Sequence, residues 1–142
     1  MKEYLYFINI LILMNYKLAD EKLLVFIIKK LIKEKKIIIS QTKFLSLVLN
    51  ELNQSGFEYK LSGERLRKIS INKANIKVEI EYKDLGKDSK NLKICPVCGN
   101  KLIDIFNLTL DGKKITAGKK CTKCPYWTGQ TIRMPRKYTF MR

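Results

Sequence analysis

Four cysteines constrain the fold of this chain more than any other feature of its sequence. They stand in two CxxC pairs, Cys95 with Cys98 and Cys121 with Cys124, and 22 residues (121 − 98 − 1) separate the pairs. The sequence holds no other cysteine and no histidine, so a site built from the whole set is all-thiolate. Two residues between thiolates allow a tight turn to point both sulfurs at one centre, and Zn²⁺ binds four thiolates as a closed tetrahedron. The spacing therefore predicts two knuckles, joined by a hairpin, that hold one structural Zn²⁺ through Cys95, Cys98, Cys121 and Cys124.

Disulfides and a redox site are the alternatives to a metal. Disulfide frameworks are typical of secreted, cysteine-dense proteins, whereas this chain has 4 cysteines in 142 residues and no convincing cleavable signal. A redox-active CxxC is also disfavoured, because two such pairs with a hairpin between them fit one metal better.

Lysine and arginine give the chain a formal net charge of +16. Residues 1–90 carry 18 Lys and Arg against 11 Asp and Glu, a net charge of +7, and residues 91–142 carry 11 against 2, a net charge of +9. Such an excess favours a polyanionic partner, because cations that neutralise phosphates release counterions. A solvated lysine-rich surface is the alternative. Lys outnumbers Arg 24 to 5, and an AT-rich genome or a hot habitat also produces such a lysine-rich composition. The high lysine content is not matched by a similar content of Asp and Glu, so we expect contact with nucleic acid.

Residues 4–14 form an almost wholly apolar run, YLYFINILILM. The run is too short for a membrane span, which needs about 20 residues, and no small-residue cleavage site follows it. We therefore expect a cytoplasmic protein in which this run is a helix packed on a partner subunit, in a homodimer formed through residues 4–32. A signal anchor and a translation start at Met14 are the alternatives.

Capping residues and apolar periodicity predict three helices and two short strands. Asp20 and Ser40 are candidate N-caps of two amphipathic helices, with a β-branched strand at residues 37–39 between them. Ser62 is the candidate N-cap of a third, short helix with a cationic outer surface. Residues 76–82 then alternate apolar and charged side chains, which is typical of a half-buried strand.

The order helix, strand, helix, cationic helix, strand over about residues 18–83 resembles the winged helix-turn-helix family. In that family the third helix enters the DNA major groove and the following strand belongs to the wing. Arginine suits guanine edges and bidentate phosphate contacts. The alternatives are a basic face that only keeps the helix soluble and a winged domain that only docks proteins. The resemblance implies that four cations face DNA: Arg65, Arg67, Lys68 and Lys73.

The second half of the chain predicts a small antiparallel sheet. Residues 101–110 and 113–120 are expected to form a hairpin, because Asp111 and Gly112 between them are a strong turn signal. Residues 126–134 are expected to supply a third strand.

Residues 94–128 resemble the zinc ribbons of transcription factors, polymerase subunits and ribosomal proteins. Transcript-cleavage factors of that group carry an adjacent Asp-Glu pair at the ribbon tip. Here the tip has one acid, Asp111, beside Lys113 and Lys114, which argues against cleavage stimulation. The combination of a winged helix and a C-terminal ribbon resembles small archaeal proteins of the transcription-factor type.

No catalytic motif is visible in the sequence. It has no histidine for acid–base work and no P-loop, GxSxG or HExxH motif. A zinc ion held by four thiolates has no open coordination position, so we expect no enzyme and no small-molecule substrate. Tyr126 and Trp127, beside the second CxxC, are of a type that stacks on bases, especially in RNA. Covering the apolar side of a small ribbon is the favoured interpretation of this pair.

We therefore expect an α+β fold with an N-terminal extension (1–14), a winged helix-turn-helix domain (15–85), a linker (86–93) and a zinc ribbon with a basic C-terminal tail (94–142). The predicted function is DNA binding by a transcription regulator, with the ribbon adding phosphate contacts or docking on the transcription machinery. An RNA-binding protein associated with ribosomes or their assembly is the first alternative, and a protein-docking adaptor is the second. Outside the third helix, the expected nucleic-acid contacts are Lys119, Lys120, Arg136 and Lys137.

Overall fold

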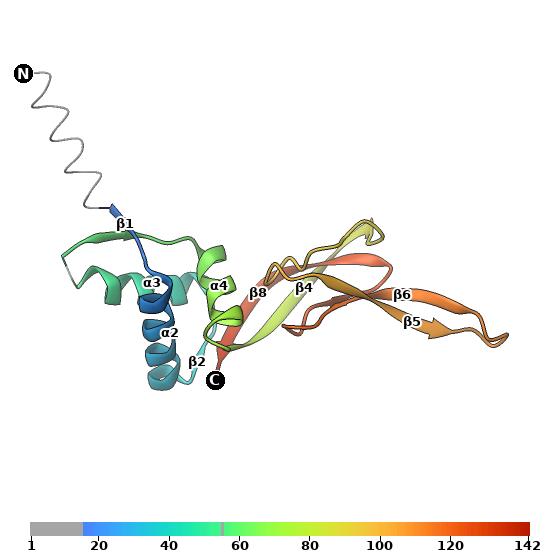
Figure 1. Ribbon diagram of the computed structural model, residues 1–142, viewed down its shortest axis with the longest axis horizontal. Coiled ribbons are helices and arrows are strands. Elements are labelled where there is room, and N and C mark those ends of the chain that lie inside the picture. The colour runs from blue at the N-terminus through green and yellow to red at the C-terminus, as the bar shows by residue number, and fades with distance from the viewer. Residues whose placement is uncertain (1–15, 55) are drawn as a thin grey trace, which may run out of the picture.

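The structure is a computed structural model that describes residues 16–54 and 56–142 (Figure 1). The helix expected at residues 4–14 lies outside the described residues, so the homodimer expected through residues 4–32 stays a prediction. The described part is α+β, as predicted, with helices at one end and two antiparallel sheets extending away from them. No helix among the described residues combines the length and the apolar character that a membrane crossing requires.

The helices at one end of the molecule begin where the capping residues predict. They are α2 (Glu21–Lys35), α3 (Gln41–Asn53) and α4 (Gly63–Asn72). The Ser40 hydroxyl accepts the Lys43 amide at 2.9 Å, and the Ser62 hydroxyl accepts the Arg65 amide at 3.1 Å. Each bond satisfies an amide that the first helical turn leaves unpaired. Asp20 occupies the N-cap position of α2 without a side-chain hydrogen bond.

The apolar stripes of the three helices meet in one core, and the C-terminal strand completes it. Phe140, two residues before the last residue of the sequence, packs its ring on Phe44 of α3 with 4.8 Å between the ring centroids. The apolar spacing at i, i+3 and i+4 therefore predicted the part of this core that the helices supply, but it did not predict Phe140. The fully buried side chains here are Leu24, Ile28, Ile32, Phe44, Val48, Leu66 and Phe140.

The central sheet joins strands from distant parts of the sequence. Its order is β2 (Ile37–Ile38), β8 (Thr131–Met141) and β4 (Lys77–Asp88), and both pairings are antiparallel. In Figure 1, β8 runs beside β4 and brings the C-terminus back to the helices.

Two expectations about this region were wrong. Residues 86–93 do not form a linker throughout, because β4 continues to Asp88. The basic C-terminal tail is instead strand β8, since its apolar residues pair with β4 and fill the helical core. Pro135 within β8 lies at a register shift opposite Tyr82, and such irregularities tolerate a residue without an amide hydrogen.

The second antiparallel sheet has the order β5 (Leu102–Leu108), β6 (Lys114–Cys121) and β7 (Trp127–Thr128). The hairpin between β5 and β6 turns at Asp111 and Gly112, as predicted, and Gly112 has a φ of 82°. This hairpin forms the end of the molecule farthest from the helices (Figure 1). A separate parallel pair joins β1 (Tyr16–Leu18) to β3 (Glu58–Lys60) beside the helices.

Candidate metal centre

The four cysteines converge as their spacing predicts. All four are buried, and their Sγ atoms lie within 4.8 Å of one another. The shortest contacts cross between the two knuckles, at 3.5 Å for Cys95 with Cys124 and 3.4 Å for Cys98 with Cys121. These distances exceed the disulfide bond length of about 2.05 Å and are close to the ~3.8 Å edge of a tetrahedron with metal–sulfur bonds of about 2.3 Å. The four thiols can therefore hold one metal ion.

Backbone hydrogen bonds shape the two knuckles around this centre. In the first knuckle the Gly99 amide donates to the Cys95 carbonyl at 3.0 Å, and Gly99 has a φ of 80°, a conformation that glycine adopts without steric strain. In the second knuckle the Cys121 amide donates to the Tyr126 carbonyl at 2.9 Å, and the Lys123 amide donates to the Cys121 sulfur at 3.3 Å. The thiols are thus fixed by local chain geometry.

The sulfurs share protons that a cation can replace. The hydrogen bond with Cys124 lowers the pKa of Cys95 to about 5, and the same bond raises the pKa of Cys124. Burial raises the pKa of Cys98, which the hydrogen bond from the Asn100 side chain partly offsets. Metal ligation requires thiolates, so binding at this centre is expected to release protons.

The first knuckle of the cysteine cluster is hydrogen-bonded to helix α4. Asn72, at the end of α4, donates its side-chain amide to the Cys98 carbonyl at 3.0 Å. The Asn72 side-chain oxygen accepts the Asn100 amide at 2.7 Å, and Asn100 also donates to the Cys98 sulfur at 3.0 Å. Groups that orient a ligand in this way tune a metal site. Neither asparagine was predicted, because only the fold brings the end of α4 to the first knuckle.

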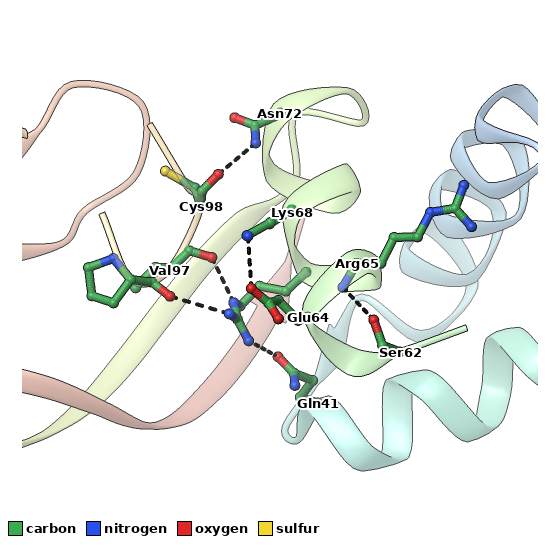
Figure 2. A network of polar contacts seen from close by, with 10 residues as sticks. Gln41, Ser62, Glu64, Arg65, Lys68, Asn72, Val97 and Cys98 are labelled. Atoms are coloured by element: carbon green, nitrogen blue, oxygen red, sulfur yellow. Dashed lines mark hydrogen bonds and ion pairs between the residues drawn. The ribbon is translucent and has the colours of Figure 1, made fainter. Parts of the chain in front are cut away.

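Arg67 also joins α4 to the same knuckle (Figure 2). Its Nε donates to the Val97 carbonyl at 2.7 Å, and its Nη1 donates to the Gln41 side chain at 2.8 Å. Its guanidinium also lies 4.6 Å from the Tyr138 ring centroid. The residue is 8% exposed, so the expectation that Arg67 faces DNA was wrong. The first knuckle therefore covers the side of α4 that holds Arg67.

The other cations of α4 have partners within the chain. Arg65 points away from the knuckle toward α2 (Figure 2), where it donates to the Ala19 carbonyl at 2.7 Å. Lys68 pairs with Glu64 at 2.8 Å, and its side chain also lies against Gly99. At the helix end, Lys73 lies 3.7 Å from the Glu21 carboxylate. Lys68 and Lys73 stay partly exposed, but α4 offers no continuous basic face.

The predicted cations outside α4 divide into two groups. Lys119 is half-buried and donates to the Lys90 and Leu92 carbonyls at 3.0 and 2.7 Å, so it ties β6 to the segment after β4. In contrast, Lys120 on β6 and Arg136 and Lys137 on β8 are exposed.

The aromatic pair after the second knuckle divides between core and surface. Tyr126 is buried, as the favoured interpretation held, and its hydroxyl donates to the Arg133 carbonyl at 2.8 Å. Trp127 is 48% exposed, and the Arg133 guanidinium carbon lies 3.7 Å from its ring centroid. The same carbon lies 3.9 Å from the Tyr82 ring centroid. Arg133 and Tyr82 were not predicted as site residues, because only the pairing of β4 with β8 brings them together.

The arrangement can thus bind one metal ion that joins the two knuckles, the first of which contacts α4. When all four thiolates bind, a tetrahedral ion has no open position for water.

Comparisons of the chain with known protein families, with curated proteins and with solved structures find no match.

Proposed function

We propose that this chain is a non-enzymatic nucleic-acid-binding protein that combines a winged helix with a zinc ribbon. The order α2, β2, α3, α4 and β4 supports the winged helix, and β8 supplies the second strand of its wing by pairing with β4. The sheet of β5, β6 and β7, with its four cysteines, is then a ribbon inserted between the two wing strands.

Zinc is the metal that the donor set favours. Four soft thiolates in a closed, buried cluster are the usual ligands of structural Zn²⁺. We assign one Zn²⁺ per chain to Cys95, Cys98, Cys121 and Cys124. In this assignment the ion stabilises the ribbon and takes no part in a reaction.

The observation that carries nucleic-acid binding is the cationic excess of the ribbon and wing. Residues 91–142 hold 11 Lys and Arg against 2 Asp and Glu. Lys120, Arg136 and Lys137 project this charge into solvent from β6 and β8. Phosphate contacts made by such side chains release counterions and favour association with a polyanion.

The covered face of α4 favours RNA over duplex DNA. A helix reads DNA by entering the major groove, but the first knuckle covers the Arg67 and Asn72 side of α4, and Arg65 is turned toward α2. The strands of the ribbon and wing would then make the contacts with nucleic acid. Exposed strands with aromatic side chains are a common binding surface for unpaired RNA bases. We therefore place an RNA-binding role ahead of the DNA-reading regulator.

The test is a fluorescence anisotropy titration of the zinc-loaded chain with labelled single-stranded RNA, structured RNA and duplex DNA at several salt concentrations. We expect tighter binding to RNA than to duplex DNA at equal salt, and affinity that falls as salt rises. Changing Lys120, Arg136 and Lys137 to Ala should weaken RNA binding. Changing Lys22, Lys29 and Lys33, which are exposed on α2, removes the same charge and should weaken it less.

Three outcomes would contradict parts of this proposal. If no nucleic acid binds, the protein-docking adaptor becomes the favoured function. Tighter binding to duplex DNA would restore the DNA-reading hypothesis. Equal losses from the two sets of lysine and arginine variants would show that total charge, and not the ribbon and wing, determines affinity.

A further inference from the structure

One exposed row of side chains crosses the ribbon sheet from edge to edge. Ile103 on β5 pairs with Lys120 on β6, and Lys120 pairs with Trp127 on β7. Directly paired residues in a sheet point to the same face, and all three side chains are exposed. The row therefore presents an apolar group, a cation and an indole ring side by side.

Arg133 extends this row beyond the sheet. Its guanidinium carbon lies 3.7 Å from the ring centroid of Trp127 and 3.9 Å from that of Tyr82. Tyr82 in turn lies 6.0 Å from the ring of buried Tyr126, whose backbone carbonyl closes the second knuckle. These contacts connect Trp127 and Arg133, through Tyr82, to the residue that closes the second knuckle.

Charge on this face is mainly positive. Asp104 and Lys119 pair with each other on the opposite face of the sheet, because side chains alternate along a strand. Asp84, the cross-strand partner of Arg133, is the carboxylate on the Arg133 side of β4. Its two oxygens accept hydrogen bonds from the Gly86 amide and the Thr131 hydroxyl. Lys120 and Arg133 thus put two cations beside Trp127, whose side chain is 48% exposed.

We propose that this face binds an unpaired segment of RNA. One base stacks on Trp127, and Lys120 and Arg133 contact the flanking phosphates. The occupant is single-stranded because bases in a duplex already stack on each other and present no free ring face, whereas unpaired bases stack on aromatic side chains. This inference rests on the proposed nucleic-acid function and names the site and the form of nucleic acid that it takes.

The chain offers an intrinsic probe and a matched control for this site. Trp127 is its one tryptophan, so the indole fluorescence reports on this position alone. Phe106 on β5 is exposed to the same degree, 49% against 48%, and also carries a cation, Lys114, at 4.2 Å from its ring centroid. Phe106 differs because no second aromatic ring completes a stack with that cation among the described contacts.

The first measurement titrates the zinc-loaded chain with oligoadenylate RNA and follows Trp127 fluorescence. We expect quenching that saturates with binding, since a stacked base contacts the indole directly. Heparin, a polyanion without bases, should bind without comparable quenching. Duplex RNA and single-stranded DNA form the other arms. Stronger quenching by duplex RNA would overturn the single-stranded assignment, and tighter binding of single-stranded DNA would overturn the choice of RNA.

The second measurement compares variants by anisotropy with the same labelled RNA. Trp127→Ala should lower affinity about tenfold or more, as loss of one base-stacking contact does. Trp127→Phe should retain most of the affinity, which separates loss of stacking from misfolding. Phe106→Ala should change affinity less than twofold.

If Trp127→Ala and Phe106→Ala change the RNA affinity equally, or if RNA binds without quenching Trp127 fluorescence, the assignment of the site to this face is wrong. The proposed nucleic-acid function would remain. Failure of every nucleic acid to bind in the anisotropy assay would instead overturn both.

Discussion

Arg67 shows how a single residue can reverse an interpretation. On a helical wheel its charge marks an outer, ligand-facing surface, yet the knuckle of a distant segment provides carbonyl acceptors for it. A guanidinium buried in this way must be paired, because an unpaired buried charge costs several kcal/mol. The sequence pattern identifies a cation and cannot say whether its partner lies within the chain.

Removing the Arg67 side chain should therefore destabilise the fold. Arg67→Ala leaves the Val97 carbonyl and the Gln41 side chain without their partner, and we expect a loss of about 2–4 kcal/mol in the free energy of unfolding. Urea denaturation of the zinc-loaded chain measures this. Arg136→Ala is the matched control, since Arg136 is exposed, and should change the free energy by about 0.5 kcal/mol or less. Unchanged stability with lost nucleic-acid binding would instead return Arg67 to the ligand-facing role.

Asn100 should influence the metal more than the fold. Its side chain donates to the Cys98 sulfur and to Asn72, so Asn100→Ala removes the contact that orients one ligand. We expect zinc affinity to fall about 10- to 100-fold, measured by competition with a chromogenic chelator. Asn107→Ala, on the exposed part of β5, should leave the affinity unchanged. Equal affinities for the two variants would show that Asn100 does not support the site.

At the scale of elements, β8 is the part that local patterns describe least well. Its arginines, lysine and proline are typical of a solvated tail, while Phe140 is a core residue and Tyr138 packs against the core. Their partners on β4 lie about 60 residues earlier, as in the pair of Val78 with Phe140. A strand is identified by its partner as much as by its own sequence.

Phe140 should be among the most costly positions to truncate. It is fully buried against Phe44, so Phe140→Ala removes a ring from the helical core, and we expect a loss of about 3–5 kcal/mol in unfolding free energy. Thermal or urea unfolding monitored by circular dichroism measures the loss. Met134→Ala on the same strand, where the side chain is 38% exposed, should cost much less. Similar small losses for both variants would mean that the C-terminal segment is the tail that its composition suggests.

At the scale of the whole molecule, the sequence predicted the parts better than their connection. The helices, the four-cysteine cluster and the hairpin at Gly112 follow from spacing, caps and turn chemistry that act over a few residues. The position of the ribbon between β4 and β8, and the contact of its first knuckle with α4, depend on long-range pairing that no local pattern encodes. The burial of Arg67 on α4 was missed for the same reason, whereas Lys120, Arg136 and Lys137 are exposed and their contact with nucleic acid stays a prediction.

The central claim is that one zinc ion organises the knuckles and holds them on α4. Native mass spectrometry of the intact chain, followed by hydrogen–deuterium exchange before and after chelation, tests it most directly. We expect one zinc per chain, and chelation should raise amide exchange both in residues 94–128 and in α4, because metal binding supplies folding free energy to so small a unit. Protein purified without metal that keeps both segments protected, or chelation that leaves α4 unchanged, would contradict the account.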